Sequence, residues 1–301
     1  MQIKQLTYLV ALAREQHFGR AAAACHVSQP TLSAGISQLE DDLGVPLVER
    51  GRRFNGLTPE GRRVLDHATR ILAECDSLRQ GLDLSRGGLT GRLRLGVVPT
   101  AIPMVARLTV PLNARFPKVT LSILSLTSAE IQRGIENFEL EAGITYLDNE
   151  PLEHVRARPL YGEGYLFLTG AGGRFGARES LTWKEAAEAP LCLLTPDMQN
   201  RRILDGIFRS VGIAPAAVLE TNSMLSLCLH AGAGDWSSIV PAPLISIFGL
   251  PKGTIALPLV VPLVSRSVGL IIANREPASP LARALFDLAA EYPAEAATIP
   301  I

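Results

Sequence analysis

The segment AAAACHVSQPTLSAGISQLE, residues 21–40, decides how the N-terminal part of the chain folds. Its four consecutive alanines suit a helix that another backbone approaches closely, and the HVS that follows indicates a turn. Ser28 is a favourable N-cap, and Pro30 in the next helical turn sacrifices no backbone hydrogen bond. The pattern therefore predicts two short helices, of which the second begins at Gln29 and ends near Leu43.

The second of these helices carries hydrogen-bonding side chains along its exposed side. Gln29 has the geometry to pair bidentately with adenine, and hydroxyls in the first turn suit bases or phosphates. The arrangement predicts a helix-turn-helix that places this helix in the DNA major groove, although an ordinary hairpin of helices with a solvated surface has the same periodicity. The residues predicted to contact DNA here are Ser28, Gln29, Pro30, Thr31, Ser33 and Ser37.

The next segment, residues 45–61, favours a small β-wing. VPLVERGRRFNGLTPEG reads as two short strands joined by a basic turn that contains Asn-Gly. Arg50, Arg52 and Arg53 are predicted to contact phosphates or the minor groove. Residues 1–60 hold six Lys or Arg against six Asp or Glu, so one copy would bind DNA weakly. DNA binding then requires two or more copies tied together.

Residues 59–86 supply a means of tying copies together. Thr58 and Pro59 start a helix that carries apolar residues at every third or fourth position, with charged residues on its other faces. A helix of this length pairs with a partner helix, so we expect dimers through a linker helix. The apolar seam consists of Val64, Leu65, Ala68, Ile71, Leu72, Cys75, Leu78 and Leu82.

After Gly91 the pattern changes to apolar strands alternating with amphipathic helices, which predicts a parallel α/β sheet. Ligands bind such folds at the carboxyl ends of strands. Each candidate hydroxyl alone is equally a helix cap, but together, beside helix N-termini, they predict a site for a small anion such as a carboxylate. The candidates for this site are Thr100, Ala101, Ser125, Thr127, Ser128, Thr195, Gln199 and Asn200. Arg201 and Arg202 either add charge to it or lie in solvent.

Composition bounds the remaining possibilities. The chain has 301 residues, 47% of them hydrophobic, and 29 basic against 29 acidic side chains, so it has the length for two or three compact units and its bulk charge indicates no partner. The four cysteines lack C-x-x-C spacing and no signal peptide precedes the first helix, which predicts a cytoplasmic location. The apolar stretch 253–273 is interrupted by Pro258, Pro262 and Arg266, so no membrane span is expected.

The sequence favours no enzyme. The five histidines show no ligand spacing, so neither a metal nor a cofactor is expected. GAGGRFG, residues 170–176, lacks the third glycine of a dinucleotide-binding loop, and no nucleophile motif is present.

The ordered run FGRAAAACHVSQPTLSAGISQLEDDLGVPLVER, residues 18–50, followed by LTPEG, resembles the N-terminal signature of the LysR-type transcriptional regulators. The rest of the chain is similar to their linker helix and two-lobed effector domain. The sequence departs from the family at Ala34 and Gly35, where longer side chains are usual, and at Val48, where phenylalanine is usual. Fewer DNA contacts from the predicted recognition helix would follow from the first two changes.

The resemblance implies an α plus α/β protein: a winged helix-turn-helix, a long linker helix and a two-lobed α/β effector domain of periplasmic-binding-protein type. It implies dimers through the linker helix, usually assembled into tetramers. We therefore expect a regulator that binds a double-stranded operator and responds to a small-molecule effector. The alternative is a solute-binding or small-molecule-transforming α/β protein whose helical N-terminus serves oligomerisation. The expected domains are 1–58, 59–90 and 91–301, with lobe I at about 92–161 and 266–301 and lobe II at about 162–265.

Overall fold

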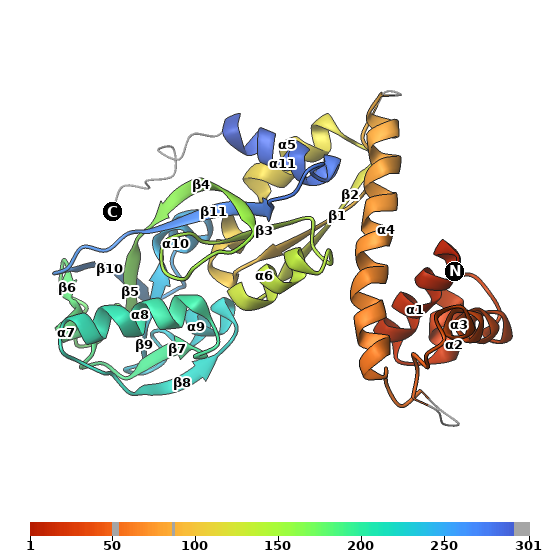
Figure 1. Ribbon diagram of the computed structural model, residues 1–301. Coiled ribbons are helices and arrows are strands. Elements are labelled where there is room, and N and C mark those ends of the chain that lie inside the picture. Colours follow the sequence, from red (N-terminus) through yellow and green to blue (C-terminus); the bar gives the residue numbers. More distant parts are fainter. Residues whose placement is uncertain (50–53, 86–87, 292–301) are drawn as a thin grey trace. The chain divides into compact units, whose positions relative to one another are not determined.

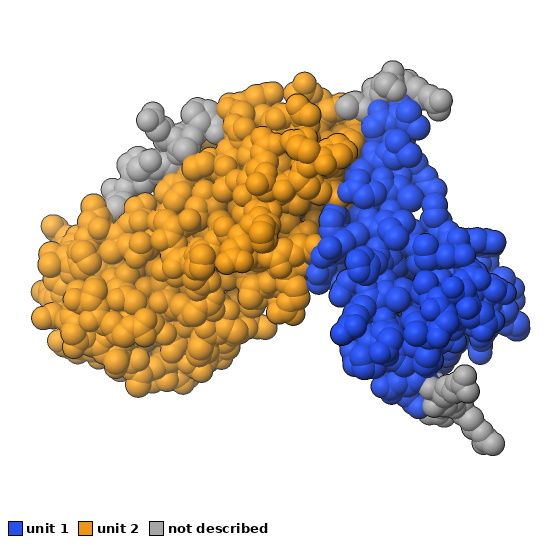
Figure 2. Space-filling model, in the orientation of Figure 1, with its two compact units in different colours: residues 1–87, 137–139 blue, residues 88–136, 140–301 orange. Residues whose placement is uncertain are grey.

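The computed structural model describes residues 1–49, 54–85 and 88–291 (Figure 1). The chain divides into two compact units, residues 1–87 with 137–139 and residues 88–136 with 140–301, which Figure 2 colours separately. The domain and lobe boundaries given above stay predictions.

The first unit is helical. Its helices are α1 (Ile3–Glu15), α2 (Phe18–Ala24), α3 (Gln29–Leu43) and α4 (Pro59–Ser85). Polar caps fix where two of them start: the His17 ring accepts from the amide of Gly19, and the Ser28 hydroxyl accepts from that of Thr31 at 3.3 Å. Such caps satisfy amides that have no partner inside the helix. α3 therefore begins and ends where the sequence predicts.

The segment after α3 forms less sheet than the sequence predicts. In its described part, one antiparallel bridge pairs Val48 with Leu57, and hydrogen bonds from the Glu49 amide to the Gly56 carbonyl and from the Thr58 amide to the Leu47 carbonyl flank it. The two sides of the predicted wing thus pair, but over a shorter length than two regular strands. The reason lies in Glu40, whose carboxylate accepts from the amides of Leu47 and Val48 at 2.7 and 3.0 Å. Part of the strand's hydrogen-bonding capacity is thus taken by α3. Arg50, Arg52 and Arg53 lie outside the described residues.

Close packing joins this segment to α4. A Cβ atom at Gly61 would lie 2.0 Å from the carbonyl oxygen of Leu47, so no other residue fits there without moving backbone. This close approach explains why the last position of the LTPEG signature is a glycine. It lets the first turn of α4 rest directly on the wing segment.

The apolar seam of α4 has two parts. Ala68 is buried, and Val64, Leu65 and Leu72 pack with it in a core that α1 and α3 complete through Leu6, Leu9 and Leu39. By contrast, Ile71, Leu78 and Leu82 are exposed, Leu78 to 67%. The prediction that the whole seam contacts a partner helix was therefore too broad, since its N-terminal part packs within its own helix-turn-helix unit.

The second unit contains two sheets. The first has the order β2-β1-β3-β11-β4 and the second β6-β10-β5-β9-β7-β8. We call the sheet-bearing halves lobe I and lobe II. The strands of lobe I are β1 (Gly91–Val97), β2 (Val119–Ser125), β3 (Ala142–Tyr146), β4 (Val155–Glu163) and β11 (Arg266–Ala273). Those of lobe II are β5 (Tyr165–Gly170), β6 (Leu181–Thr182), β7 (Leu191–Leu194), β8 (Ala217–Thr221), β9 (Ser237–Pro241) and β10 (Thr254–Val260).

The sheets are mixed rather than parallel, which corrects the sequence prediction. Among the described strands, β11 runs antiparallel to β3 and β4, and β5 runs antiparallel to β9 and β10. Both strands follow a direct passage between the lobes, β4 to β5 and β10 to β11. Each of these two strands enters its sheet from the other lobe and not through a helical crossover within its own sheet, so the strand-helix alternation of the sequence does not set its direction.

Helices cover both sheets. In lobe I, α5 (Ala106–Arg115) and α11 (Pro280–Leu288) lie on one side and α6 (Ser128–Glu136) on the other (Figure 1). In lobe II, alternate residues of β7 enter different cores: Leu191 and Leu193 pack toward α8 (Gln199–Ser210), while Cys192 and Leu194 pack toward α9 (Met224–His230). The shorter helices are η1 (Pro99–Met104), α7 (Trp183–Ala186), α10 (Ala242–Phe248) and η2 (Ala289–Glu291). No helix in the described ranges has the length and apolar character to cross a membrane.

Candidate functional site

The first candidate site is the N-terminal surface of α3. Ser28, Gln29, Pro30, Thr31, Ser33 and Ser37 are all exposed. The hydroxyls of Ser28 and Thr31 lie 2.8 Å apart and bond to each other, which fixes both at the start of the helix. The buried side of the helix consists of Leu32, Ile36 and Leu39. One face thus holds the helix in its unit and the other presents polar groups outward.

Gly35 departs from the family pattern for a reason that the structure supplies. A Cβ atom at this position would lie 2.6 Å from Cδ2 of Tyr8, whose ring is buried beneath α3. The absence of a side chain at 35 is therefore matched to a tyrosine at position 8.

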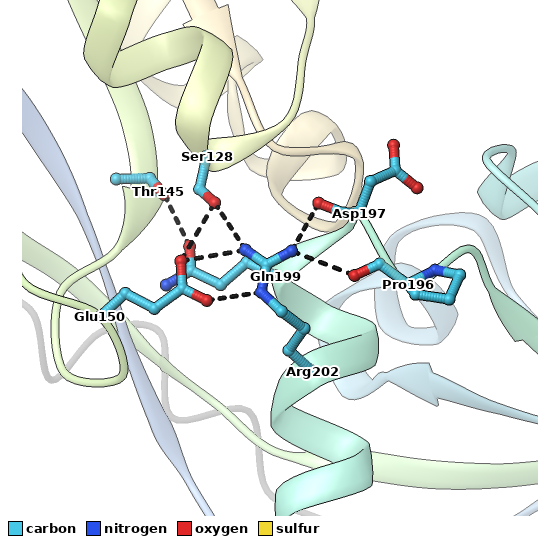
Figure 3. Close-up of polar contacts among 7 residues, drawn as sticks. All are labelled: Ser128, Thr145, Glu150, Pro196, Asp197, Gln199 and Arg202. Atoms are coloured by element: carbon cyan, nitrogen blue, oxygen red, sulfur yellow. Dashed lines mark hydrogen bonds and ion pairs between the residues drawn. The ribbon is translucent and has the colours of Figure 1, made fainter.

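The second candidate site joins the start of α8 in lobe II to side chains of lobe I. The Thr145 hydroxyl donates to Gln199 Oε1 at 3.1 Å, and the Asn200 amide donates to the Tyr146 hydroxyl at 3.0 Å. One turn further, the Arg202 guanidinium contacts Ser128 and Glu150 (Figure 3). Three predicted residues, Ser128, Gln199 and Asn200, thus meet here and are buried.

Tyr146 is the centre of a buried polar cluster. Its hydroxyl donates to Glu163 Oε1 at 2.5 Å and lies 3.0 Å from the Thr100 hydroxyl as well as from Asn200. Glu163 ends β4, at the passage from lobe I to lobe II, and is 0% exposed. Its Oε2 and the hydroxyls of Tyr161 and Tyr165 have no hydrogen-bond partner within the described residues.

Burial dominates the ionisation of this cluster. Loss of hydration raises the pKa of Glu163 to about 8, against the opposing effect of the hydrogen bond from Tyr146. Burial and the neighbouring Glu163 charge also raise the pKa values of Tyr146, Tyr161 and Tyr165 well above the usual value. At neutral pH the cluster is thus mostly uncharged.

Other predicted residues have different surroundings. Ala101 is fully buried and apolar, and Ser125 is exposed at the end of β2. Thr127 caps α6, because its hydroxyl donates to Glu130 Oε2 at 2.9 Å and accepts from the Glu130 amide. Thr195 differs from these: its Oγ1 is buried and has no partner in the part of the chain that the structure describes.

Sequence reasoning missed Thr145, Tyr146, Glu150 and Glu163. The last carried a signal, since a carboxylate between two tyrosines in the run RPLYGEGYLFL interrupts otherwise strand-forming residues. Arg201 and Arg202 were predicted either to add charge to the anion site or to lie in solvent, and the structure distinguishes them. Arg201 bonds within lobe II to Asp205, Glu220 and the Leu194 carbonyl, while Arg202 reaches lobe I.

The cysteines lie away from these polar contacts. Burial raises the pKa of the Cys192 and Cys228 thiols, and also that of Cys25, where the nearby Arg14 charge opposes the effect. No group of three or more His, Cys, Asp or Glu suited to a metal occurs in the described ranges.

Comparison with known proteins assigns both the N-terminal and the C-terminal part of the chain to one family. Residues 3–62 match the model of the bacterial regulatory helix-turn-helix protein, lysR family, and residues 86–294 match the LysR substrate binding domain. The chain belongs to the LysR family. It is a LysR-type DNA-binding transcriptional regulator with a winged helix-turn-helix and a two-lobed effector domain.

Individual relatives agree with this assignment. The DNA-binding transcriptional dual regulator OxyR of Escherichia coli is 30% identical over 282 residues, 93% of this chain and 91% of that protein. A full-length OxyR variant from Pseudomonas aeruginosa superposes with a TM-score of 0.77 at 28% identity, covering 97% of this chain and 94% of the other. Full-length CbnR in complex with its target DNA gives 0.70 at 23% identity, covering 97% and 100%, and supports the LysR-type fold.

Proposed function

We propose that this LysR-type regulator binds a double-stranded operator as a dimer or tetramer and that a small anionic effector modulates the binding. Ser28, Gln29, Pro30, Thr31, Ser33 and Ser37 would contact DNA, joined by Arg50, Arg52 and Arg53. The observation that carries the DNA-binding role is the uninterrupted polar, exposed start of α3 above a fully apolar buried side. Family membership favours this function over a solute-binding protein with an oligomerising N-terminus.

Gln29→Ala is expected to weaken binding to a cognate duplex by about 1 to 3 kcal/mol and to relax specificity at one base pair. The duplex is obtained by selection in vitro with the full-length protein, and affinities are measured by fluorescence anisotropy. Gln38→Ala is the matched control, since Gln38 is exposed on the same helix about two and a half turns further on, and so on the opposite side from Gln29. Equal losses on cognate and random duplexes would remove Gln29 from base recognition.

The effector part of the proposal rests on the start of α8. Hydroxyl and amide groups of both lobes converge there, and Thr195 Oγ1 is buried with no partner among the described residues. An unpaired buried hydroxyl costs free energy that a bound ligand would recover. We assign the effector to Thr100, Ser128, Thr195, Gln199 and Asn200. Ser125 and Thr127 are less suited to contact the effector, because Ser125 is exposed and Thr127 caps α6.

Thr195→Val is expected to weaken binding of the effector about 5- to 150-fold while leaving the fold intact, since the hydroxyl bonds to no group in the described ranges. A calorimetric screen of small organic acids against the full-length protein identifies the ligand, and footprinting on the selected duplex shows its effect. Ser125→Ala serves as control because Ser125 is exposed. An acid that shifts the footprint but binds Thr195→Val as tightly as wild type would refute the assignment.

Several relatives are named hydrogen peroxide-inducible genes activators, so peroxide is a further candidate signal. Peroxide oxidises thiolates, and burial lowers the thiolate fraction of Cys192 and Cys228 by raising their pKa. We therefore expect hydrogen peroxide to leave operator binding unchanged in wild type, Cys192→Ser and Cys228→Ser alike. A peroxide-dependent footprint that either substitution abolishes would contradict this expectation.

A further inference from the structure

Arg202 makes an unusually complete set of contacts. Its Nε and Nη2 donate to Glu150 Oε1 and Oε2 at 2.6 and 3.0 Å, a bidentate pair. Nη2 also donates to Ser128 Oγ at 3.2 Å, and Nη1 donates to the carbonyls of Pro196 and Asp197 at 3.2 and 2.6 Å. All five N–H groups of the guanidinium are thereby matched by acceptors (Figure 3).

These contacts cross between the lobes. Ser128 starts α6, and Glu150 lies in the connection between β3 and β4, so both belong to lobe I. Arg202 and the two carbonyls belong to lobe II. Ser128 Oγ also lies 3.4 Å from Glu150 Oε2, so the carboxylate is held by one hydroxyl and one guanidinium from opposite lobes. A carboxylate in this position joins the lobes.

We propose that Ser128 and Arg202 form a carboxylate-binding position that Glu150 occupies from within the chain, and that the carboxylate of the effector binds by replacing it. The inference rests on the effector-binding function proposed above. The Arg202 Nε and Nη2 groups and the Ser128 hydroxyl, which now bond to Glu150, would donate hydrogen bonds to the carboxylate of the ligand. Glu150 is then an internal competitor that sets how much effector is needed.

Two features of the contact favour replacement of Glu150 over movement of Arg202. Two carbonyls of its own lobe hold Arg202 through Nη1, so the guanidinium stays in place when Glu150 leaves. The Glu150 side chain is 33% exposed and lies in an irregular connection, where rotation brings its carboxylate into water. The buried Ser128, 8% exposed, remains with its hydroxyl free to bond the incoming anion.

The charge balance selects the ligand class. A carboxylate replaces Glu150 without leaving Arg202 unpaired, whereas a neutral ligand would leave a partly buried guanidinium without a counter-charge. The chain therefore discriminates against neutral analogues at this position. Bidentate geometry adds a preference for a planar carboxylate.

The test uses acetate as the probe and acetamide as its neutral analogue, with binding to the full-length protein followed by ligand-observed NMR. Removing an internal competitor raises the apparent affinity by the inverse of the fraction of protein molecules in which the position is free. Glu150→Gln should therefore bind acetate roughly ten-fold more tightly than wild type. Acetamide should bind none of the proteins. Glu150→Gln combined with Arg202→Gln should lose the gain.

Glu153→Gln is the matched control, because it removes the same charge from an exposed position of the same connection. Equal acetate affinity in wild type, Glu150→Gln and Glu153→Gln overturns the proposal, and so does a gain that survives Arg202→Gln. The footprint on the selected duplex separates this inference from the proposed function. Tighter acetate binding with an unchanged footprint supports the anion position and contradicts effector control. An organic acid that shifts the footprint independently of Glu150 and Arg202 supports effector control and contradicts the proposed anion position.

Discussion

Leu78→Asp is expected to convert the full-length protein to monomers and to weaken its binding to the selected duplex by roughly 100-fold or more, the usual range of effective-concentration effects. Leu78 is 67% exposed on α4 and follows Ile71 by seven residues, the spacing of a helix–helix seam. A carboxylate there would be desolvated in any helix–helix contact. With the dimer lost, two α3 helices no longer bind one duplex together.

Sedimentation velocity gives the mass, and anisotropy gives the affinity. Leu78→Met, which keeps an apolar side chain, should behave as wild type. Leu72 is unsuitable for this experiment, because it packs in the core shared by α1 and α4 and its loss would disturb the fold. Unchanged mass and affinity for Leu78→Asp would show that this part of α4 makes no contact with another copy.

Glu163→Gln should abolish much of the pH dependence of effector-domain stability. The pKa of Glu163 is raised in the folded state to about 8 from an ordinary value of 4.5, so the folded protein holds its proton more tightly than the unfolded chain. Stability is therefore highest below about pH 4.5 for this group, and falls as pH rises from there through about 8. The difference is on the order of 5 kcal/mol at most.

Both tryptophans, Trp183 and Trp236, lie in the effector domain, so their fluorescence follows its unfolding alone. Urea titrations from pH 5 to 9 should show wild type losing stability relative to Glu163→Gln as pH rises. The exposed Glu179→Gln should retain the wild-type profile. Parallel profiles for wild type and Glu163→Gln would show that the carboxylate is hydrated after all.

The elements that the sequence predicted best are those fixed by local chemistry. Ser28 and Pro30 determine the start of α3 through a cap and a fixed backbone angle, and both act within one helical turn. The direction of a strand depends instead on how the chain re-enters the sheet, which local sequence does not determine. β5 and β11 are as apolar as β3 and β7, which do have parallel neighbours, so nothing in their composition shows that they run antiparallel to the strands beside them.

The candidate site shows the same limit. Ser128, Gln199 and Asn200 were predictable because each lies at a helix start next to a strand end. Their partners were not, since Tyr146, which bonds to Asn200, lies 54 positions away on another strand, and Glu163 joins the cluster through Tyr146. Arg201 and Arg202 look alike in the sequence. A rotation of about 100° around the helix separates a structural ion pair from a contact between lobes.

The pairing of Tyr8 with Gly35 bears on attempts to give this regulator a new operator. Grafting the recognition helix of a relative onto this chain would bring a side chain to position 35, where the Tyr8 ring already fills the space. We expect the grafted helix to shift away from α1 and its proposed DNA contacts to shift with it. We therefore expect a successful transplant to exchange residue 8 together with residue 35.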